Sequence, residues 1–371
     1  MADVVALMQP RIVDRDAFDD FVNALEDQVA EIERNVAALR KDPEDGQLVA
    51  RLFRSLHTIK GDAAICRVEV GVAICHPIES LLSRCRDGEI LFSGMLTELV
   101  LLALDRLELV IEALDAGRPT SHLNLPQLVG GLERIAGASV AEVPGLCADV
   151  IEAVTGFRSE RAPSGEMPLP EVQHQLETNR PQDQTADLAF FHSLALRLEE
   201  RSPLFRGRTE RILRLALETN ESAGAPVDAT QLQAAVFMHD VGMMFAPEAC
   251  WLKVGRLSED DRVLLNEHPQ HGSGLLQRMP GWQGAAEIVL QHHEMSDGGG
   301  YPAGLHGEGI CAGAKILAIV DAFEAVTLKH SDRGHTRSLV RAIAEINACD
   351  NQFSPEWIVT FNSVIRAMIE R

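Results

Sequence analysis

Residues 292–302 read HHEMSDGGGYP: two adjacent histidines and a glutamate lead into an aspartate, three glycines and a Tyr-Pro pair. Further residues of metal-ligand type stand before and after this stretch, namely His239-Asp240-Val241-Gly242, His268-Pro269 and Asp321. Each element is weak by itself, because HD pairs and adjacent histidines are common by chance. Together, in this order, they predict a metal site assembled from separate helices.

The predicted ligand set combines imidazoles with carboxylates. A carboxylate beside a histidine can serve two metal ions at once, and metal-bound water can then attack a phosphoryl group. A mixed set of this kind suits Fe, Mn or Zn better than Mg or Ca, so we expect one or two such divalent ions. The candidate ligands are His239, Asp240, His268, His292, His293 and Asp321.

A second motif, LHTIKGDA, surrounds His57 near the start of the chain. We expect it on a helix, where Lys60 and Gly61 lie one turn after His57 on the same face. A histidine that accepts a phosphoryl group needs access for the donor, a nearby cation and a partner that fixes its tautomer. Lys60 supplies the cation, Gly61 leaves space, and Glu79 or His76 on the next helix could orient the ring. The combination of HxxKG and HxxE favours a phosphoacceptor over an ordinary surface histidine.

Helical periodicity dominates the chain and strand signals are weak, so the predicted fold class is all-α. Four amphipathic helices with short connections predict an antiparallel bundle over residues 1–118. A polar stretch rich in proline and glutamine, residues 159–185, predicts a flexible linker. We therefore expect a first domain over 1–118, a helical extension and linker over 119–185, and a second domain over 186–371.

Composition and charge restrict the partners. The formal net charge of −21 would repel a phosphate backbone, so we expect no nucleic acid polymer as partner. Seven scattered cysteines without a CxxC pair indicate reduced thiols and a cytoplasmic location. Charged residues interrupt the apolar stretch 96–114, so we expect no membrane span.

The first region resembles a histidine phosphotransfer (Hpt) domain of the type that begins chemotaxis histidine kinases. The resemblance covers roughly residues 14–118 and rests on LFRSLHTIKGDA followed by HPIESLLSRCRDG. It implies a four-helix bundle in which a receiver domain or histidine kinase phosphorylates His57. It also implies that the hydrogen-bonding neighbours of this histidine are Lys60, His76 and Glu79. Pro77 departs from the pattern, since a proline inside a helix removes a backbone donor and favours a kink.

The second region is similar to the HD-GYP family, helical metal-dependent phosphodiesterases that hydrolyse cyclic di-GMP. The resemblance covers roughly residues 186–370 and includes LHGEGI and AKILAIVDAFEAVT besides the metal motifs. It implies that Asp240 bridges two metals, that His239 and Asp321 bind one of them, and that His268, His292 and His293 bind the other. It further implies a signature loop beside the substrate, formed by Asp297, Gly300, Tyr301 and Pro302.

Several positions depart from the family pattern. Arg208 stands where the family has its first metal histidine, three residues before Arg211. Leu204 replaces a glutamate that completes a third metal site in some members, and Met243 replaces a lysine that contacts phosphate. An Arg-Pro-Tyr triplet of the family is His330-Ser331-Asp332 here. A guanidinium at position 208 could repel a metal or stand in for one by holding a phosphate oxygen.

The sequence therefore predicts a phosphorelay signalling protein in which His57 communicates with a cyclic di-GMP phosphodiesterase-type output. One alternative is a catalytically degenerate HD-GYP domain that binds a nucleotide or a partner protein. Another is a plain phosphorelay shuttle whose second domain is only a docking surface. The retained imidazoles favour the enzyme, whereas Arg208 and Met243 favour the binding module.

Overall fold

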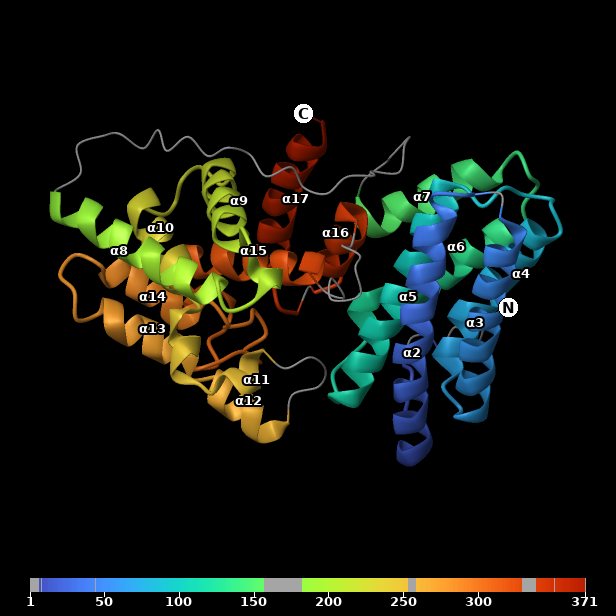
Figure 1. Ribbon diagram of the computed structural model, residues 1–371, viewed down its shortest axis with the longest axis horizontal. Helices are drawn as coiled ribbons and strands as arrows, with labels where there is room; N and C mark the ends of the chain where they lie inside the picture. The colour runs from blue at the N-terminus through green and yellow to red at the C-terminus, as the bar shows by residue number, and fades with distance from the viewer. Residues whose placement is uncertain are drawn as a thin grey trace. The chain divides into compact units, whose positions relative to one another are not determined.

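The computed structural model describes residues 7, 9–43, 45–156, 182–252, 258–328, 338–349 and 351–370. The described residues form helices joined by turns and loops, without a β-strand, which confirms the predicted all-α fold (Figure 1). The chain divides into two compact units, Met1–Ser164 with His330–Cys349, and Gly165–Lys329 with Asp350–Arg371. No helix among the described residues is long and apolar enough to cross a membrane.

The first unit begins with the predicted four-helix bundle. Its helices are α2 (Arg15–Leu39), α3 (Gly46–Ile65), α4 (Glu69–Arg86) and α5 (Gly94–Asp115). Polar residues start three of them, because a side-chain oxygen satisfies amide groups that the first helical turn leaves unbonded. Asp14 accepts a hydrogen bond from the Ala17 amide at 3.2 Å, and Ser93 accepts one from the Leu96 amide at 3.2 Å. Helix α4 continues through Pro77, so this proline does not end the helix.

Helix α5 is buried on most of its circumference, which explains its apolar composition. Two of the charged residues that interrupt this apolar stretch are buried and form ion pairs. Glu98 pairs with Arg40 at 2.6 Å, and Asp105 pairs with Arg341 at 2.6 Å. Charges inside a protein persist when opposite charges and hydrogen bonds compensate for the lost water.

An extension follows the bundle and completes the first unit. It consists of η1 (Ser121–Leu123), α6 (Leu125–Gly137) and α7 (Val143–Thr155), and α16 (Leu339–Asn347) packs against α5 and α7. Ser338 caps α16 by accepting a hydrogen bond from the Arg341 amide. Arg341 is buried, and its guanidinium donates to both carboxylate oxygens of Asp105 and, at 3.2 Å, to Glu33. A helix late in the sequence is thus built into the core of the first unit.

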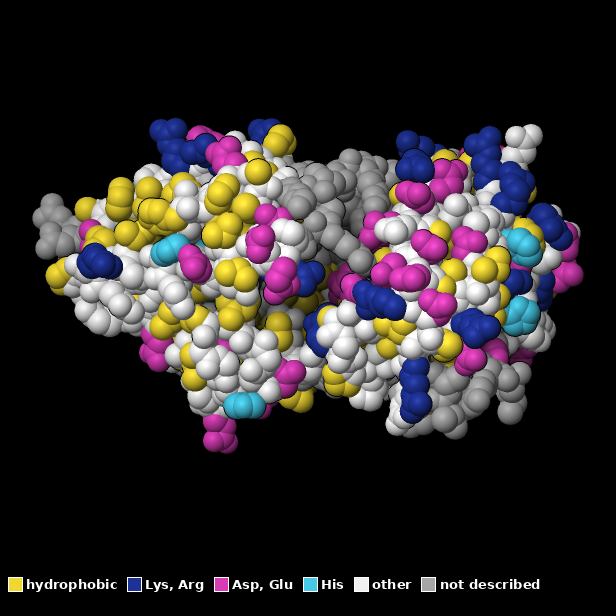
Figure 2. Space-filling model, turned by 90° about the horizontal axis from the view of Figure 1, so that it is seen from below, with side chains coloured by type: hydrophobic (Ala, Val, Ile, Leu, Met, Phe, Trp, Pro, Cys, Tyr) yellow, Lys and Arg dark blue, Asp and Glu magenta, His cyan; other side chains and the backbone are white. Residues whose placement is uncertain are grey.

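The second unit is a helical domain around α15. Its helices are α8 (Gln182–Glu199), η2 (Pro203–Phe205), α9 (Arg208–Ser222), α10 (Ala229–Met238), η3 (Val241–Phe245), α11 (Glu248–Trp251), α12 (Glu259–Leu265), α13 (His268–Leu276), α14 (Gln283–Gln291), η4 (Gly307–Gly309), α15 (Ala312–Leu328) and α17 (Pro355–Glu370). Helix α8 begins inside the stretch expected as a linker, and residues 157–181 lie outside the described part. On the face shown in Figure 2, acidic and basic side chains are interspersed, without a continuous basic surface.

Candidate functional sites

The candidate phosphoacceptor His57 lies on an exposed face of α3, with 63% of its side chain accessible. Its Nδ1 atom is 2.5 Å from Oε1 of Glu79 on α4, and Oε2 of Glu79 is paired with Lys60. Burial disfavours the Glu79 carboxylate, but the hydrogen bonds from Lys60 and His57 outweigh it and lower the pKa of Glu79. An ionised Glu79 holds the proton of His57 on Nδ1, so Nε2 carries the lone pair.

The other residues around His57 are His76, Gly61 and Phe53. His76 is exposed and makes no side-chain hydrogen bond among the described residues, so of the two expected partners only Glu79 bonds to the ring. A Cβ added at Gly61 would meet no atom within 4 Å, so this face is open to a docking partner. Phe53, one turn before His57, stacks on the imidazole with ring centroids 6.2 Å apart, and the guanidinium of Arg86 lies over Phe53. Phe53 was not among the predicted site residues. Its spacing of four residues from His57 on a helix was the available signal.

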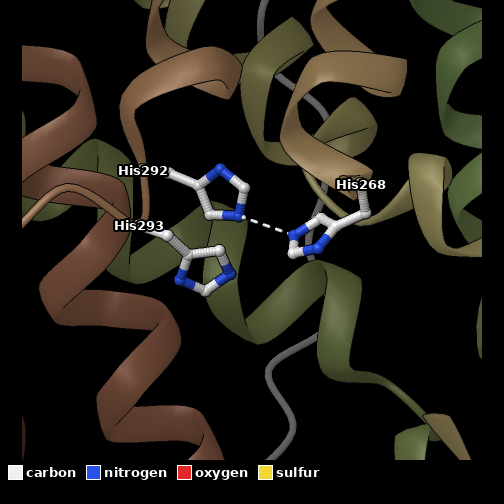
Figure 3. A group of neighbouring side chains, drawn as sticks. All are labelled: His268, His292 and His293. Atoms are coloured by element: carbon white, nitrogen blue, oxygen red, sulfur yellow. Dashed lines mark hydrogen bonds between the residues drawn. The ribbon is translucent and has the colours of Figure 1, made fainter. Parts of the chain in front are cut away.

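Three of the predicted metal ligands converge in the second unit, as Figure 3 shows. His268 is the first residue of α13, whereas His292 and His293 follow the last turn of α14. The Nε2 atoms of His268 and His292 are 3.3 Å apart, and the ring centroids of His292 and His293 are 4.1 Å apart. Because α13 and α14 pack closely, residues 24 positions apart in sequence meet at one point.

Backbone carbonyls fix the orientation of two of these rings. Nδ1 of His268 donates to the Leu265 carbonyl at 2.6 Å, and Nδ1 of His292 donates to the Val289 carbonyl at 2.7 Å. Burial also lowers the pKa of both imidazoles and lowers that of His293 to about 4, so the rings are neutral. With each proton on Nδ1, two Nε2 lone pairs face each other, an arrangement that a cation between them would stabilise. The three-imidazole group therefore fits a divalent metal.

The remaining predicted ligands form a second group of His239, Asp240 and Asp321. His239 ends α10, and its Nδ1 donates to the Val236 carbonyl at 2.7 Å. Its buried Nε2 lies 3.2 Å from Oδ2 of Asp240 and 3.6 Å from Oδ1 of Asp321, without a hydrogen bond of suitable geometry. Oδ1 of Asp240 lies 3.6 Å from Nε2 of His268, so Asp240 stands between the two groups.

Arg208 provides a cation within this second group. Its side chain is 16% exposed, and its guanidinium donates from Nη1 to Asp240 at 2.6 Å and from Nη2 to Asp321 at 2.5 Å. Burial opposes ionisation of both carboxyls, but the guanidinium and His239 outweigh it and lower the pKa of Asp240 and of Asp321. One turn along the same helices, α9 and α15, Arg211 pairs with the buried Glu324. Arg208 and Arg211 thus form two successive sets of buried ion pairs between α9 and its neighbours. Position 208 holds a cation bonded to two carboxylates.

The glycine-rich stretch folds back against the histidines. The Tyr301 amide donates to the His293 carbonyl at 3.1 Å, and the two rings stack with centroids 4.9 Å apart. Position 300 requires glycine, because a Cβ there would lie 2.4 Å from the Met295 amide nitrogen. Pro302 follows in this loop through a cis peptide bond, and Asp297 turns the loop by accepting a hydrogen bond from the Gly299 amide at 2.8 Å.

Glu294 holds this loop in place, a role that the sequence analysis did not assign. Its buried carboxylate accepts hydrogen bonds from the amides of Ala303 and Leu305, at 2.7 and 2.8 Å. An acidic residue directly after two candidate ligand histidines was the signal, but its partners on the far side of the loop cannot be read from sequence.

The other departures from the family pattern lie as follows. Met243 is half-buried on η3, and the preceding Gly242 is required because a Cβ would lie 2.0 Å from the His268 carbonyl oxygen. Leu204 is part of η2, but its side chain lies outside the described part of the chain, as do residues 330–332.

Family models match both halves of the chain. The Hpt domain matches residues 16–117, and the HD domain matches residues 193–356, a range that includes α16. The described ligand groups lie inside the HD match and His57 lies inside the Hpt match.

The chain has relatives among cyclic di-GMP phosphodiesterases and among chemotaxis proteins. A cyclic di-GMP phosphodiesterase of Thermotoga maritima is 33% identical over 157 residues, which cover 41% of this chain and 42% of the relative. The cyclic di-GMP phosphodiesterase response regulator RpfG of Xanthomonas campestris is 40% identical, covering 26% of each chain. The chemotaxis protein CheA of Treponema pallidum is 31% identical, covering 34% of this chain and 15% of the relative. The chain thus spans less than half the length of each of these relatives.

Proposed function

We propose a signalling function for this chain, which joins an Hpt domain to an HD domain of the HD-GYP type. His57 accepts a phosphoryl group from a receiver domain or histidine kinase, and the HD domain hydrolyses cyclic di-GMP in a metal-dependent reaction that phosphorylation controls. The observation that carries the proposal is the convergence of His268, His292 and His293, two of which have their lone pairs fixed toward one point by backbone carbonyls.

The phosphoryl transfer follows from the surroundings of His57. The Nε2 lone pair attacks the phosphorus of an aspartyl phosphate, the new N–P bond forms, and the P–O bond to the donor aspartate breaks. The leaving electron pair stays on the donor carboxylate. Glu79 accepts the hydrogen bond from Nδ1, which keeps its proton, and the carboxylate balances the positive charge that develops on the ring. Lys60, held beside Glu79, neutralises the phosphoryl oxygens that arrive at this face.

In the HD domain, His268, His292 and His293 would hold a divalent metal, with Asp240 as the adjoining carboxylate. When bound, such an ion supplies a Lewis acid and an activated water for phosphodiester hydrolysis. Arg208 keeps Asp240 and Asp321 ionised and oriented. A guanidinium has further N–H donors, which would bind a phosphate oxygen of the substrate. Tyr301, stacked on His293, forms an aromatic wall against which a nucleobase can lie.

A second candidate is a nucleotide-binding module without turnover. Its specific support is Arg208, which already neutralises both carboxylates of the second ligand group. A guanidinium binds phosphate without activating water, so a site of this composition could retain the ligand and lose the reaction.

The deciding experiment uses the full chain purified with Fe, Mn or Zn present. Metal content is measured by elemental analysis, and hydrolysis of cyclic di-GMP is followed by chromatography with and without phosphorylation of His57. The related dinucleotide 3'3'-cGAMP serves as a second substrate. Relatives from Vibrio cholerae that are 34–35% identical to parts of this chain are named as specific for it. Loss of metal and turnover in His292→Gln is expected. Metal-loaded protein that binds either dinucleotide without hydrolysing it would replace the enzyme with the binding module.

A further inference from the structure

The extension after the Hpt bundle contains a cavity that neither ligand group uses. It has a volume of about 590 Å³, within the range of small-molecule pockets. Its walls come from α5, η1, α6, α7 and α16, all parts of the first unit. Most of its lining lies between residues 122 and 154, outside the stretches that the two family models match.

One wall of the cavity carries a nearly buried guanidinium. Arg106 on α5 is 5% exposed, and Nη2 donates one hydrogen bond, 3.3 Å long, to the Ala344 carbonyl on α16. Within the part of the chain that the structure describes, Arg106 makes no ion pair. The adjacent carboxylate, Asp105, is paired with Arg341 instead. Burial lowers the pKa of Arg106, because desolvation outweighs the attraction of nearby anionic groups. A guanidinium has five N–H donors, so one hydrogen bond leaves most of those of Arg106 available to a ligand in the cavity.

The rest of the lining favours a small anion with polar substituents. Arg134 on α6 adds a second cation and is exposed, whereas Asp149 is the one acidic residue of the lining. Asn124 and Gln127 add amide groups around the start of α6. Two arginines against one carboxylate stand out in a chain whose formal net charge is −21.

We propose that this cavity binds a small oxyanion, a phosphate- or carboxylate-bearing metabolite held by Arg106 and Arg134. The anion satisfies the N–H groups of Arg106 that the protein leaves unbonded, and Arg134 closes over it from the exposed side. The site is separate from the HD ligand groups, so it stands whether or not the HD domain is an enzyme.

Position 130 offers a clean way to fill the cavity. Gly130 lines it, and a Cβ added there would meet no atom within 4 Å, so a larger side chain grows into open space. Gly130→Leu should fill the site. Gly130→Ala, at the same position, is the matched control, because a single methyl group leaves most of the volume open. Its neighbour is unsuitable, because a Cβ on Gly131 would lie 2.6 Å from Val150.

The test is equilibrium dialysis of the full chain against radiolabelled inorganic phosphate and, separately, radiolabelled succinate, at constant ionic strength. We expect one saturable site for at least one of the two ions, with the preferred ion identifying the natural headgroup. Gly130→Leu should abolish binding, Gly130→Ala should retain it, and Arg134→Gln should weaken it at least about tenfold through loss of a charge-assisted contact.

Helical circular dichroism and the unfolding midpoint of each variant are measured beside the binding. If Gly130→Leu unfolds, the exposed Arg134→Gln decides the question alone. Binding that survives both Gly130→Leu and Arg134→Gln places the anion elsewhere and overturns the proposal. Absence of saturable binding of both ions in the millimolar range overturns it as well.

Discussion

Replacing Arg208 by histidine tests how the second ligand group is kept stable. In the wild type, the guanidinium joins Asp240 and Asp321 through hydrogen bonds of 2.6 and 2.5 Å, and only 16% of its side chain is exposed. Removing one partner from a buried ion pair costs about 3–5 kcal/mol, because the other charges remain buried. We therefore expect Arg208→His, studied in a chelator, to unfold at a clearly lower urea concentration than the wild type.

Added metal should reverse part of this loss. A histidine at position 208 completes the group of His239, Asp240 and Asp321 as a metal site, and an ion that binds only the folded state stabilises it. The gain is about 2.7 kcal/mol when free metal is about a hundred times Kd. Elemental analysis should show an additional ion per chain relative to the wild type.

The matched control is Arg211→His on the same helix. Arg211 makes an equivalent buried pair with Glu324 one turn away, so its loss should destabilise the chain similarly. It lies outside both ligand groups, so added metal should restore no more stability than in the wild type. Equal metal rescue in the two variants, or no metal gain in Arg208→His, would refute the assignment of Arg208 as the cation of this group.

Three further perturbations follow from the described contacts. Glu79→Gln should slow phosphorylation by about tenfold to a hundredfold, because the charged hydrogen bond to Nδ1 of His57 is lost. His57→Gln should abolish acid-labile labelling. Labelling that persists at another residue would contradict the assignment of His57. Arg341→Met should lower the free energy of unfolding by about 3–5 kcal/mol in urea titrations, against less than about 1 kcal/mol for the exposed Arg34→Met. Gly300→Ala should cost about 1–3 kcal/mol and disturb the stack of the only tyrosine, which its ring NMR signals would report. Gly299→Ala should do so much less, because the nearest atom to its Cβ is a side-chain oxygen of Asp297 at 3.1 Å rather than backbone.

The fold was largely predictable because its signals are local. Apolar residues at helical spacing, with Asp14, Asp45 and Ser93 before three of the helices, indicate where the bundle helices lie. Proline is disfavoured inside a helix, yet α4 continues through Pro77. Packing against neighbouring helices can outweigh such a local preference, which sequence alone does not reveal.

The site was predictable to the extent that its residues carry their own chemistry. Histidines and carboxylates can be recognised in the sequence as possible metal ligands. The structure brings the six predicted ligands together in two groups of three. The sequence allowed two roles for Arg208, repelling a metal or replacing one. Choosing between them requires knowing which carboxylates its guanidinium reaches, and only the structure shows this. Glu294 and Phe53 were missed for the same reason, since their partners are set by tertiary structure.

The division of the chain into domains shows why a sequence match and a packed unit can differ. Helix α16 lies inside the residues matched as an HD domain, yet Val340, Ala344 and Ala348 belong to the hydrophobic core of the first unit. Arg341, on the same helix, is buried against Asp105 and Glu33 of the Hpt bundle. Cutting the chain at the start of α8 would expose this apolar face and leave Arg341 without its carboxylates, at a cost comparable to a broken buried ion pair. A domain boundary drawn from the sequence match alone would therefore remove a helix that the core of the first unit contains.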